Sequence, residues 1–235
     1  MRSVLLGLAA ILLVLPAADA ARLPVVVIDP GHDLRANGDT EPIGPASPTQ
    51  KIKDGGGTRG VVSGLTEPEL NLRVALRLRP LLQAAGVRVV MTRTENAGTS
   101  MGNIARARIA NRVDAGLFLR IHADGSLDPS ARGSHTLYPR LRRGWTDDVY
   151  APSKRAARIV QSEVVRALGF PDRGLQERSD FTGFNWSDAP VILVEMGFMT
   201  NPTDDRLLAT AAYQRRAALG LCRGTLRFLG LAPRC

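Results

Sequence analysis

The sequence predicts an α/β fold: a single domain with a mostly parallel central sheet and helices on both faces of that sheet. Continuous apolar runs at 25–28, 117–119 and 191–194, with a fourth at 87–91, are typical of strands that are buried on both faces of a parallel sheet. Stretches with helical spacing of apolar residues separate these runs. Because strands alternate with helices, we expect one sheet with a helical layer on each side.

Three stretches carry the helical pattern. The apolar residues that recur on one face are Leu70, Val74, Leu78 and Leu81 in the first stretch and Val160, Val164 and Leu168 in the second. Pro80 is expected to kink or shorten the end of the first helix, because its ring clashes with the preceding turn. The stretch from 211 to 229 is predicted to close the domain as a helix.

The segment 35–64 is expected to be a long loop over or near the functional site. It is rich in Gly, Pro, Ser, Thr and Asp and has no apolar period, and long loops in compact domains are usually functional or disordered. One interpretation is that it covers the site and limits access. No internal repeat and no Pro/Gly linker leads to a second module, so residues 21–235 are predicted to form one domain.

Composition excludes several classes of protein. Of the 235 residues, 44% are hydrophobic and 23% are charged, which excludes a disordered tail protein, a collagen-like chain and a multi-pass membrane protein. The net charge of +9 favours anionic surfaces such as cell-wall polymers, although the charge could also serve solubility alone. Aromatic residues make up 5% and no basic helix carries stacking residues, so we expect no nucleic-acid partner.

The first twenty residues resemble a cleaved signal peptide. Arg2 gives the positive start, 5–15 is almost wholly apolar, and 18–20 reads Ala-Asp-Ala, a small-x-small cleavage site. The apolar run is too short to span a bilayer comfortably, so we expect no stable membrane span. The predicted mature protein begins near Ala21 and is secreted or held in the cell envelope; an uncleaved anchor is the alternative.

Three of the apolar runs end in residues that suit metal or acid–base chemistry. The first leads to His32, the second to His122 and the third to Glu195. Ligands bind outside the carboxyl ends of parallel strands, so these side chains are expected to converge at one edge of the sheet. Two histidines there suggest a metal, and two His plus one carboxylate is a known ligand set for catalytic zinc.

The third ligand is expected near the start of the first helix, at Thr66-Glu67-Pro68-Glu69. The spacing predicts a capping box in which Thr66 caps the helix and Glu69 reaches back to it, leaving Glu67 free to point into the site. The alternative is that both glutamates merely decorate the helix start, where negative charge is favourable. His135 lies in a short predicted strand at 134–138 and is interpreted as structural.

Five motifs occur in an order that resembles the zinc-dependent N-acetylmuramoyl-L-alanine amidases of type 3. They are DPGH at 29–32, EPELNL at 67–72, RARIAN at 106–111, IHAD at 121–124 and PVILVEMGFMTN at 190–201. The resemblance covers essentially the whole mature chain. Residues 178–180 and 183–185 most resemble the small single-domain amidases of actinobacteria.

The resemblance implies that His32, Glu67 and His122 bind one Zn²⁺ and that Glu195 is the catalytic carboxylate. It further implies hydrolysis of the amide between N-acetylmuramic acid and L-alanine in peptidoglycan. We expect the protein to be a monomer. A zinc peptidase acting on another wall-peptide amide and a non-catalytic wall-binding protein on the same fold are the alternatives. Asp33 stands where Gly is common in the family, Asp124 stands where Asn is frequent, and the loop at 35–64 is longer than in many members.

Two acidic or basic residues near the motifs and the two cysteines are interpreted as follows. Asp29 could accept a hydrogen bond from a ligand histidine, or it could simply end its strand. Arg106 is expected to form an ion pair within the fold. Cys222 and Cys235 are too few for a four-cysteine zinc ribbon. In an exported chain they could form a disulfide, but Cys222 lies in an apolar helical pattern, so a buried free thiol is the alternative.

Overall fold

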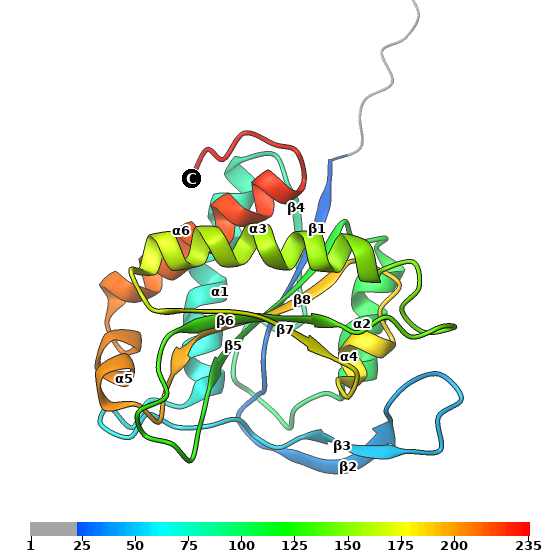
Figure 1. Ribbon diagram of the computed structural model, residues 1–235, viewed down its shortest axis with the longest axis horizontal. Coiled ribbons are helices and arrows are strands. Elements are labelled where there is room, and N and C mark those ends of the chain that lie inside the picture. Colours follow the sequence, from blue (N-terminus) through cyan, green and yellow to red (C-terminus); the bar gives the residue numbers. More distant parts are fainter. Residues whose placement is uncertain (1–22) are drawn as a thin grey trace, which may run out of the picture.

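A six-stranded, mostly parallel sheet forms the centre of the computed structural model, which describes residues 23–235 (Figure 1). The strand order is β4-β1-β5-β8-β6-β7; every neighbouring pair is parallel except β6 and β8. The strands are β1 (Val25–Pro30), β4 (Arg88–Met91), β5 (Leu117–Asp124), β6 (Ser134–Pro139), β7 (Asp172–Arg178) and β8 (Val191–Phe198). The predicted sheet is therefore confirmed, whereas the predicted signal peptide at 1–20 lies outside the described residues.

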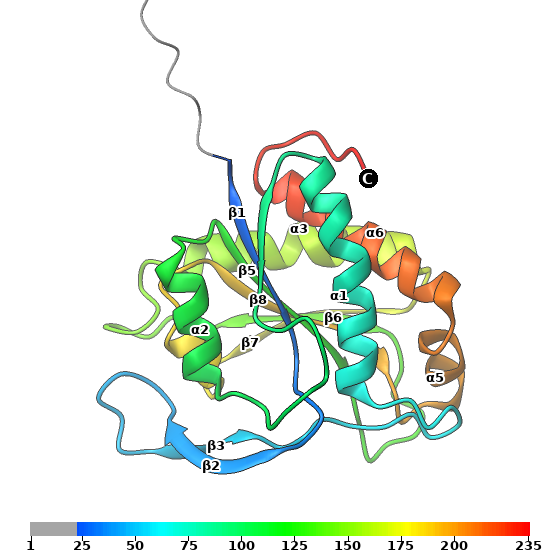
Figure 2. The ribbon, with the colours of Figure 1, turned by 180° about the vertical axis from the view of Figure 1, so that it is seen from behind.

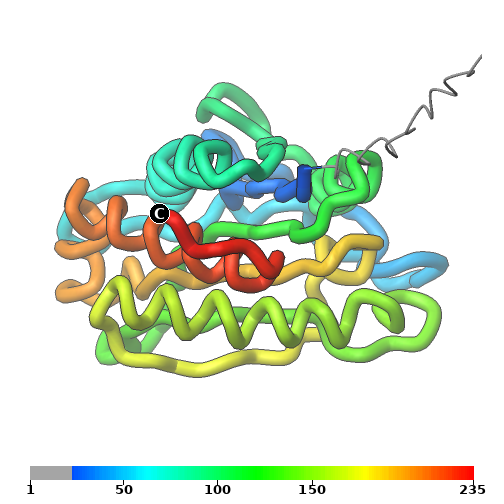
Figure 3. Tube along the Cα trace, turned by 90° about the horizontal axis from the view of Figure 1, so that it is seen from above, coloured from blue at the N-terminus to red at the C-terminus, as the bar shows by residue number. Residues whose placement is uncertain are grey.

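Helices cover both faces of the sheet, as predicted. One face carries α1 (Glu67–Ala84), α3 (Tyr150–Leu168) and α6 (Ala211–Phe228), with α6 lying between the other two (Figures 1 and 3). The other face carries α2 (Asn103–Arg112) and the single turn α4 (Thr182–Asn185). The remaining helix, α5 (Pro202–Leu208), follows β8 and packs against it.

Two hydrophobic clusters, one on each face, explain why the strand sequences are continuously apolar. Val26 and Ile28 of β1 pack in the cluster under α1, α3 and α6, whereas Val27 between them packs against α2 and α4. All three side chains are fully buried. A strand between two helical layers has no solvent side, so it needs no polar alternation.

The segment 35–64 is not the irregular loop that its composition predicts. It contains an antiparallel hairpin of β2 (Asn37–Pro42) and β3 (Gln50–Asp54), which lies beside α2 and α4 outside the main sheet (Figures 1 and 2). Glu41 is buried and accepts hydrogen bonds from the Asn103 and Ile104 amides, and so caps α2. The hairpin has no apolar period because it is held by such polar contacts and exposes much of its surface.

The first helix is longer than predicted. It runs four residues beyond Pro80, so the expected shortening is wrong. Pro80 lies on the solvent-exposed side of α1, where water can replace the hydrogen bond that proline cannot donate.

The C-terminal tail is tied to the last helix. Cys222 of α6 and Cys235 form a disulfide, which settles the choice between the two sequence interpretations. Within residues 23–235, no helix combines the length and apolar character required to cross a membrane.

Candidate metal centre

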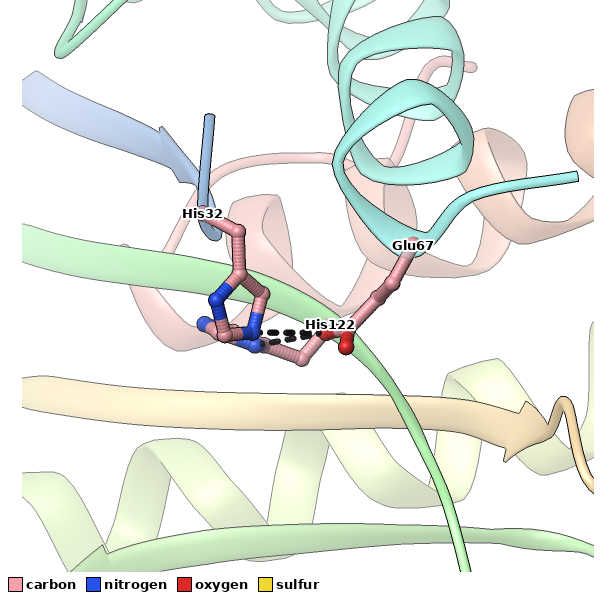
Figure 4. Close-up of side chains that lie close together, drawn as sticks. All are labelled: His32, Glu67 and His122. Atoms are coloured by element: carbon pink, nitrogen blue, oxygen red, sulfur yellow. Dashed lines mark hydrogen bonds and ion pairs between the residues drawn. The ribbon is translucent and has the colours of Figure 1, made fainter. Parts of the chain in front are cut away.

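Three side chains from distant parts of the sequence converge at the carboxyl end of the sheet (Figure 4). His32 follows β1, Glu67 is the first residue of α1 and His122 lies in β5, and one potential ligand atom from each is within 4.8 Å of the others. Both imidazoles face one carboxylate oxygen. Oε1 of Glu67 lies 3.2 Å from Nε2 of His32 and 2.9 Å from Nδ1 of His122. The structure thus brings together the three residues that the sequence predicts as ligands.

A glycine allows the two histidines to approach. The Gly31 amide donates to the Ile121 carbonyl, which ties the end of β1 to β5 just before His122. A Cβ atom on Gly31 would lie 2.1 Å from Cε1 of His122, well inside van der Waals contact. His32 itself has a φ of 60°, a left-handed conformation that turns the chain back towards the sheet edge.

Glu67 reaches the site without the predicted capping box. The Thr66 side chain makes no capping hydrogen bond, and Glu69 pairs with Arg73 on the exposed side of the helix. That expectation is wrong because Pro68 and the backbone of the preceding segment fix the helix start instead: the Glu67 amide donates to the Thr58 carbonyl over 2.9 Å. The Thr58 amide in turn donates to Oε2 of Glu67, also over 2.9 Å, and so orients the carboxylate.

His32 is oriented by Asp54, not by Asp29. The Asp54 carboxylate, at the end of β3, hydrogen-bonds Nδ1 of His32 and leaves Nε2 facing Glu67. Asp29 is fully buried and is engaged by Arg106, by Arg120 at 2.8 Å and by the Thr92 hydroxyl, so the first of its two interpretations, a bond to a ligand histidine, is wrong. The predicted ion pair of Arg106 is confirmed.

Arg93 is a supporting residue that the sequence reasoning missed. Its guanidinium donates to the carbonyls of Gly31 and Pro68, each over 2.9 Å, and so joins the segment before His32 to the segment after Glu67. Arg93 follows β4 at the same edge of the sheet as the other site residues. The strand-end argument that identifies the histidines could therefore have identified it.

Glu195 lies on β8 next to His122, because the two are register partners on parallel strands. It lines the same open cleft of about 510 Å³ as His32, Glu67 and His122. Its Oε2 is buried and has no hydrogen-bond partner in the part of the chain that the structure describes. Burial, together with the Glu67 and Asp124 carboxylates, raises the pKa of Glu195 well above its usual value.

His135 is a neighbour of this cleft. It is the register partner of Glu195 on β6, its ring packs against Phe198, and Nε2 lies 3.5 Å from a carboxylate oxygen of Asp124. Burial and two arginines, Arg173 and Arg178, lower the pKa of His135 to about 4, so the ring is neutral at pH 7. Strand-end reasoning does not predict this proximity, because β6 pairs antiparallel with β8.

The electrostatics of the three-residue cluster favour a cation. Burial by itself would raise the pKa of Glu67, but the two histidines hold it well below its usual range, so the residue is a carboxylate. Burial likewise opposes protonation of His32, yet the Glu67 and Asp54 carboxylates raise its pKa to about 10. His122, with burial dominant, has a pKa lowered to about 4. The Glu67 and Asp54 carboxylates thus stabilise positive charge at His32, held there as a proton that a metal ion bound to Nε2 would displace.

The donor set fits zinc. Two ligands that each lie about 2.0–2.1 Å from a tetrahedral zinc are roughly 3.3 Å apart. The two nitrogen–oxygen distances at Glu67, 3.2 and 2.9 Å, are close to that spacing. The carboxylate on the far nitrogen of His32 is also the usual partner of a metal-binding histidine.

Similarity to known proteins agrees with the motifs. A family model described as N-acetylmuramoyl-L-alanine amidase matches residues 26–227. The chain is 34% identical to the N-acetylmuramoyl-L-alanine amidase Rv3717 of Mycobacterium tuberculosis, over 87% of this chain and 86% of that protein. Its structure resembles the crystal structure of the amidase Ami1 from Mycobacterium smegmatis, with a TM-score of 0.80, 30% identity and coverage of 88% and 97% of the two chains. It also resembles an N-acetylmuramoyl-L-alanine amidase from Clostridium difficile 630, with a TM-score of 0.70, 31% identity and coverage of 88% and 97%. The chain therefore belongs to the N-acetylmuramoyl-L-alanine amidase family.

Proposed function

We propose that this protein is a zinc-dependent amidase that hydrolyses the bond between the lactyl group of N-acetylmuramic acid and the L-alanine of the stem peptide in peptidoglycan. The observation that carries the proposal is the convergence of His32, Glu67 and His122 in one cleft with Glu195. Family membership supports the choice of bond. Cell-wall peptidoglycan is accordingly the expected partner.

In this proposal His32, Glu67 and His122 hold a single zinc ion. When bound, zinc supplies a Lewis acid that activates water at neutral pH and polarises the scissile carbonyl. Asp54 accepts from Nδ1 of His32, so that Nε2, once it has lost its proton, would have its lone pair available to the ion. Thr58 holds the second oxygen of Glu67 away from the ligand position.

Glu195 is the proposed acid–base residue. Its Oε2 is buried in the cleft without a partner among the described residues, and it is therefore free to accept a proton from the attacking water. The raised pKa of Glu195 suits this role, because a base whose pKa lies nearer to neutrality can also return the proton to the leaving amine. Such general acid–base catalysis contributes about 10²–10⁴-fold to a rate.

Metal analysis of the purified protein together with Glu195→Gln tests these roles. We expect one zinc per chain in both proteins and a fall in turnover of peptidoglycan of at least about 100-fold in Glu195→Gln. Glu69→Gln is the matched control, because Glu69 is half-buried and pairs with Arg73 on the outer side of α1, away from the cluster. A wild-type protein that binds no zinc, or a Glu195→Gln protein with unchanged turnover, would contradict the proposal.

The products distinguish the alternatives. Digestion of purified peptidoglycan by an amidase leaves free lactyl carboxyl groups and intact stem peptides, whereas a zinc peptidase creates new amino-acid termini inside the stem. A non-catalytic wall-binding protein leaves the polymer uncut. The presence of all four proposed site residues in one cleft favours an enzyme over a wall-binding protein, and family membership favours the amidase over the peptidase.

We further propose that residues 1–20 direct export, that cleavage leaves a protein starting near Ala21, and that this protein acts in the cell envelope as a monomer. The disulfide between Cys222 and Cys235 supports an oxidising location, since disulfides are rare in the reducing cytosol. N-terminal sequencing of the mature protein and light scattering test the cleavage site and the oligomeric state. A retained N-terminus or a dimer at micromolar concentration would overturn the respective statement.

A further inference from the structure

A second hollow lies on the far side of α4 from the zinc site. It has a volume of about 500 Å³ and lies between α2, α4, the tip of the β2–β3 hairpin and the segment before α3. Thr182, at the start of α4, lines the pocket beside His32 and His122. Asn185, at the end of α4, lines the second hollow. A four-residue helix is roughly 6 Å long, so the two hollows are close neighbours.

The hollow contains both tryptophans of the chain. Trp145 and Trp186 are each partly exposed and both line it. Nε1 of Trp186 donates to the Pro42 carbonyl over 3.0 Å, and the Arg142 guanidinium stacks 3.6 Å from the centre of a Trp145 ring. Both indoles are therefore held in place. Gly44 also packs against the Trp145 ring, since a Cβ there would lie 2.4 Å from Cζ3, so Trp186 is the indole that offers its surface to the hollow. A fixed aromatic surface with a polar edge packs well against the C–H face of a sugar ring.

A buried acceptor without a donor lies in the lining. Asn185 is 1% exposed, and its Nδ2 donates to the carbonyls of Ile43, over 2.8 Å, and Ser179, over 3.1 Å. Its Oδ1 has no hydrogen-bond partner in the described part of the chain. An unsatisfied buried acceptor is unfavourable, so a ligand whose hydroxyl or amide N–H reaches Oδ1 would be stabilised there.

The charge of the hollow favours an anion. Arg108 and Arg112 lie one turn apart on the exposed side of α2 and both line the hollow. Within residues 23–235, neither guanidinium forms an ion pair. Asp188 is the one acidic residue in the described lining, which leaves a net positive charge. Two unpaired like charges at this spacing are mildly unfavourable until an anion joins them.

We propose that this hollow binds the glycan strand of peptidoglycan at a muramic acid whose lactyl carboxyl group is free. The proposal rests on the proposed function. Hydrolysis adds water across the lactyl–alanine amide: the C–N bond breaks, the carbonyl carbon gains the water oxygen, and the alanine nitrogen gains a proton and leaves as an amine. The sugar that remains carries a carboxylate that the substrate lacks, and this group is the expected partner of Arg108 and Arg112.

Each part of the ligand then has a matching group in the hollow. The sugar ring faces an indole, an acetamido N–H or a hydroxyl donates to Oδ1 of Asn185, and the lactyl carboxylate meets the arginines. The enzyme would hold a sugar from which it has already removed the peptide while the metal centre engages a neighbouring one on the same strand.

Binding of peptide-free glycan oligosaccharides tests the inference directly. The probe is an alternating N-acetylglucosamine–N-acetylmuramic acid chain with free lactyl groups, titrated calorimetrically into the zinc-loaded protein. Chitooligosaccharide of equal length, which lacks the lactyl carboxylate, is the comparison ligand. We expect the muramic chain to bind about 10-fold more tightly, with an affinity that falls as salt is added.

Variants locate the binding. The double substitution Arg108→Gln and Arg112→Gln should weaken binding of the muramic chain about 10-fold, whereas Asp188→Asn should strengthen it about twofold. The matched control is Arg215→Gln with Arg216→Gln, which removes two exposed arginines from α6 on the other face of the sheet. All three variants change exposed side chains, and circular dichroism melting checks that each remains folded.

The outcomes separate this inference from the proposed function, because the probe contains no amide that the enzyme would cut. Equal binding of the two oligosaccharides, or an unchanged affinity in the Arg108 and Arg112 variant, would overturn the hollow as a glycan site even if the enzyme cuts peptidoglycan. Arginine-dependent glycan binding by a protein with no zinc-dependent hydrolysis would instead contradict the proposed function alone.

Discussion

Asp54 offers a direct test of how the hairpin supports the metal centre. Its carboxylate accepts from Nδ1 of His32 and from the Gly56 amide, the latter over 2.9 Å. Replacing it with Asn keeps the size of the side chain but removes the negative charge. We expect Asp54→Asn to bind zinc more weakly, because the His32 ring loses both its fixed tautomer and the charge that increases its basicity.

The structure gives the magnitude. Burial alone would raise the pKa of Asp54, but the hydrogen bond and the charge of His32 lower it from 3.8 to about 2. A net shift of that size corresponds to about 2 kcal/mol, to which His32 contributes most and the hydrogen bonds of Ser100 and the Gly56 amide contribute the rest. The Asp54 carboxylate is buried, but only part of this energy comes from His32, so the part that bears on the metal ligand is about 1–2 kcal/mol. The expected loss in zinc affinity is therefore about 10-fold, within the range seen for partners of metal-bound histidines.

Competition with a zinc chelator measures this affinity, and turnover at saturating zinc measures what remains of the catalytic geometry. Asp39→Asn is the matched control, since Asp39 lies in the same hairpin but is exposed and pairs with Lys53 at the surface. An Asp54→Asn protein with wild-type zinc affinity, or an equal loss in Asp39→Asn, would refute the role that the geometry gives to Asp54.

Three further predictions follow from the contacts described above. Gly31→Ala places a Cβ atom where the His122 ring lies, so we expect kcat/KM to fall by about 100-fold or more, with loss of zinc. The control Gly38→Ala, whose Cβ would meet no atom within 4 Å, should behave as wild type. A fully active Gly31→Ala protein would contradict the close packing. Because Glu195 acts in its charged form and burial together with the Glu67 and Asp124 carboxylates raises its pKa, kcat/KM should rise with pH along a limb that lies above the range of an ordinary glutamate. A limb within that ordinary range would exclude this assignment. The disulfide spans a sequence separation of 13, so its reduction should lower the free energy of unfolding by up to about 3 kcal/mol. We expect Tm to fall by about 6–12 °C, with activity at 25 °C unchanged. A Tm that does not respond to reductant would show that the disulfide adds no stability.

The main sheet was predictable because its strands are buried on both faces. Burial between two helical layers demands apolar residues in the first half of β1, β5 and β8, and the runs 25–28, 117–119 and 191–194 show that demand in the sequence. β7 was missed because it is an edge strand whose residues alternate between partial and full exposure, in the polar sequence DRGLQER. The hairpin was missed for a related reason: β2 and β3 pair only with each other, and their strands carry few apolar residues.

The residues of the candidate site likewise fall into two groups, those placed by buried strands and those placed by polar contacts. His32, His122 and Glu195 follow or end buried strands, so the position of each was set by core packing that the sequence displays. Asp54 lies in a polar hairpin whose position depends on contacts such as those of Glu41 with α2 and of Asn185 with Ile43, which connect residues more than sixty positions apart without any periodic pattern. A carboxylate that orients a metal ligand needs to be near that ligand in space, but nothing requires it to be near a strand end in sequence. The groups that perform the chemistry could therefore be found from local pattern, whereas the group that orients His32 required the three-dimensional arrangement of the hairpin.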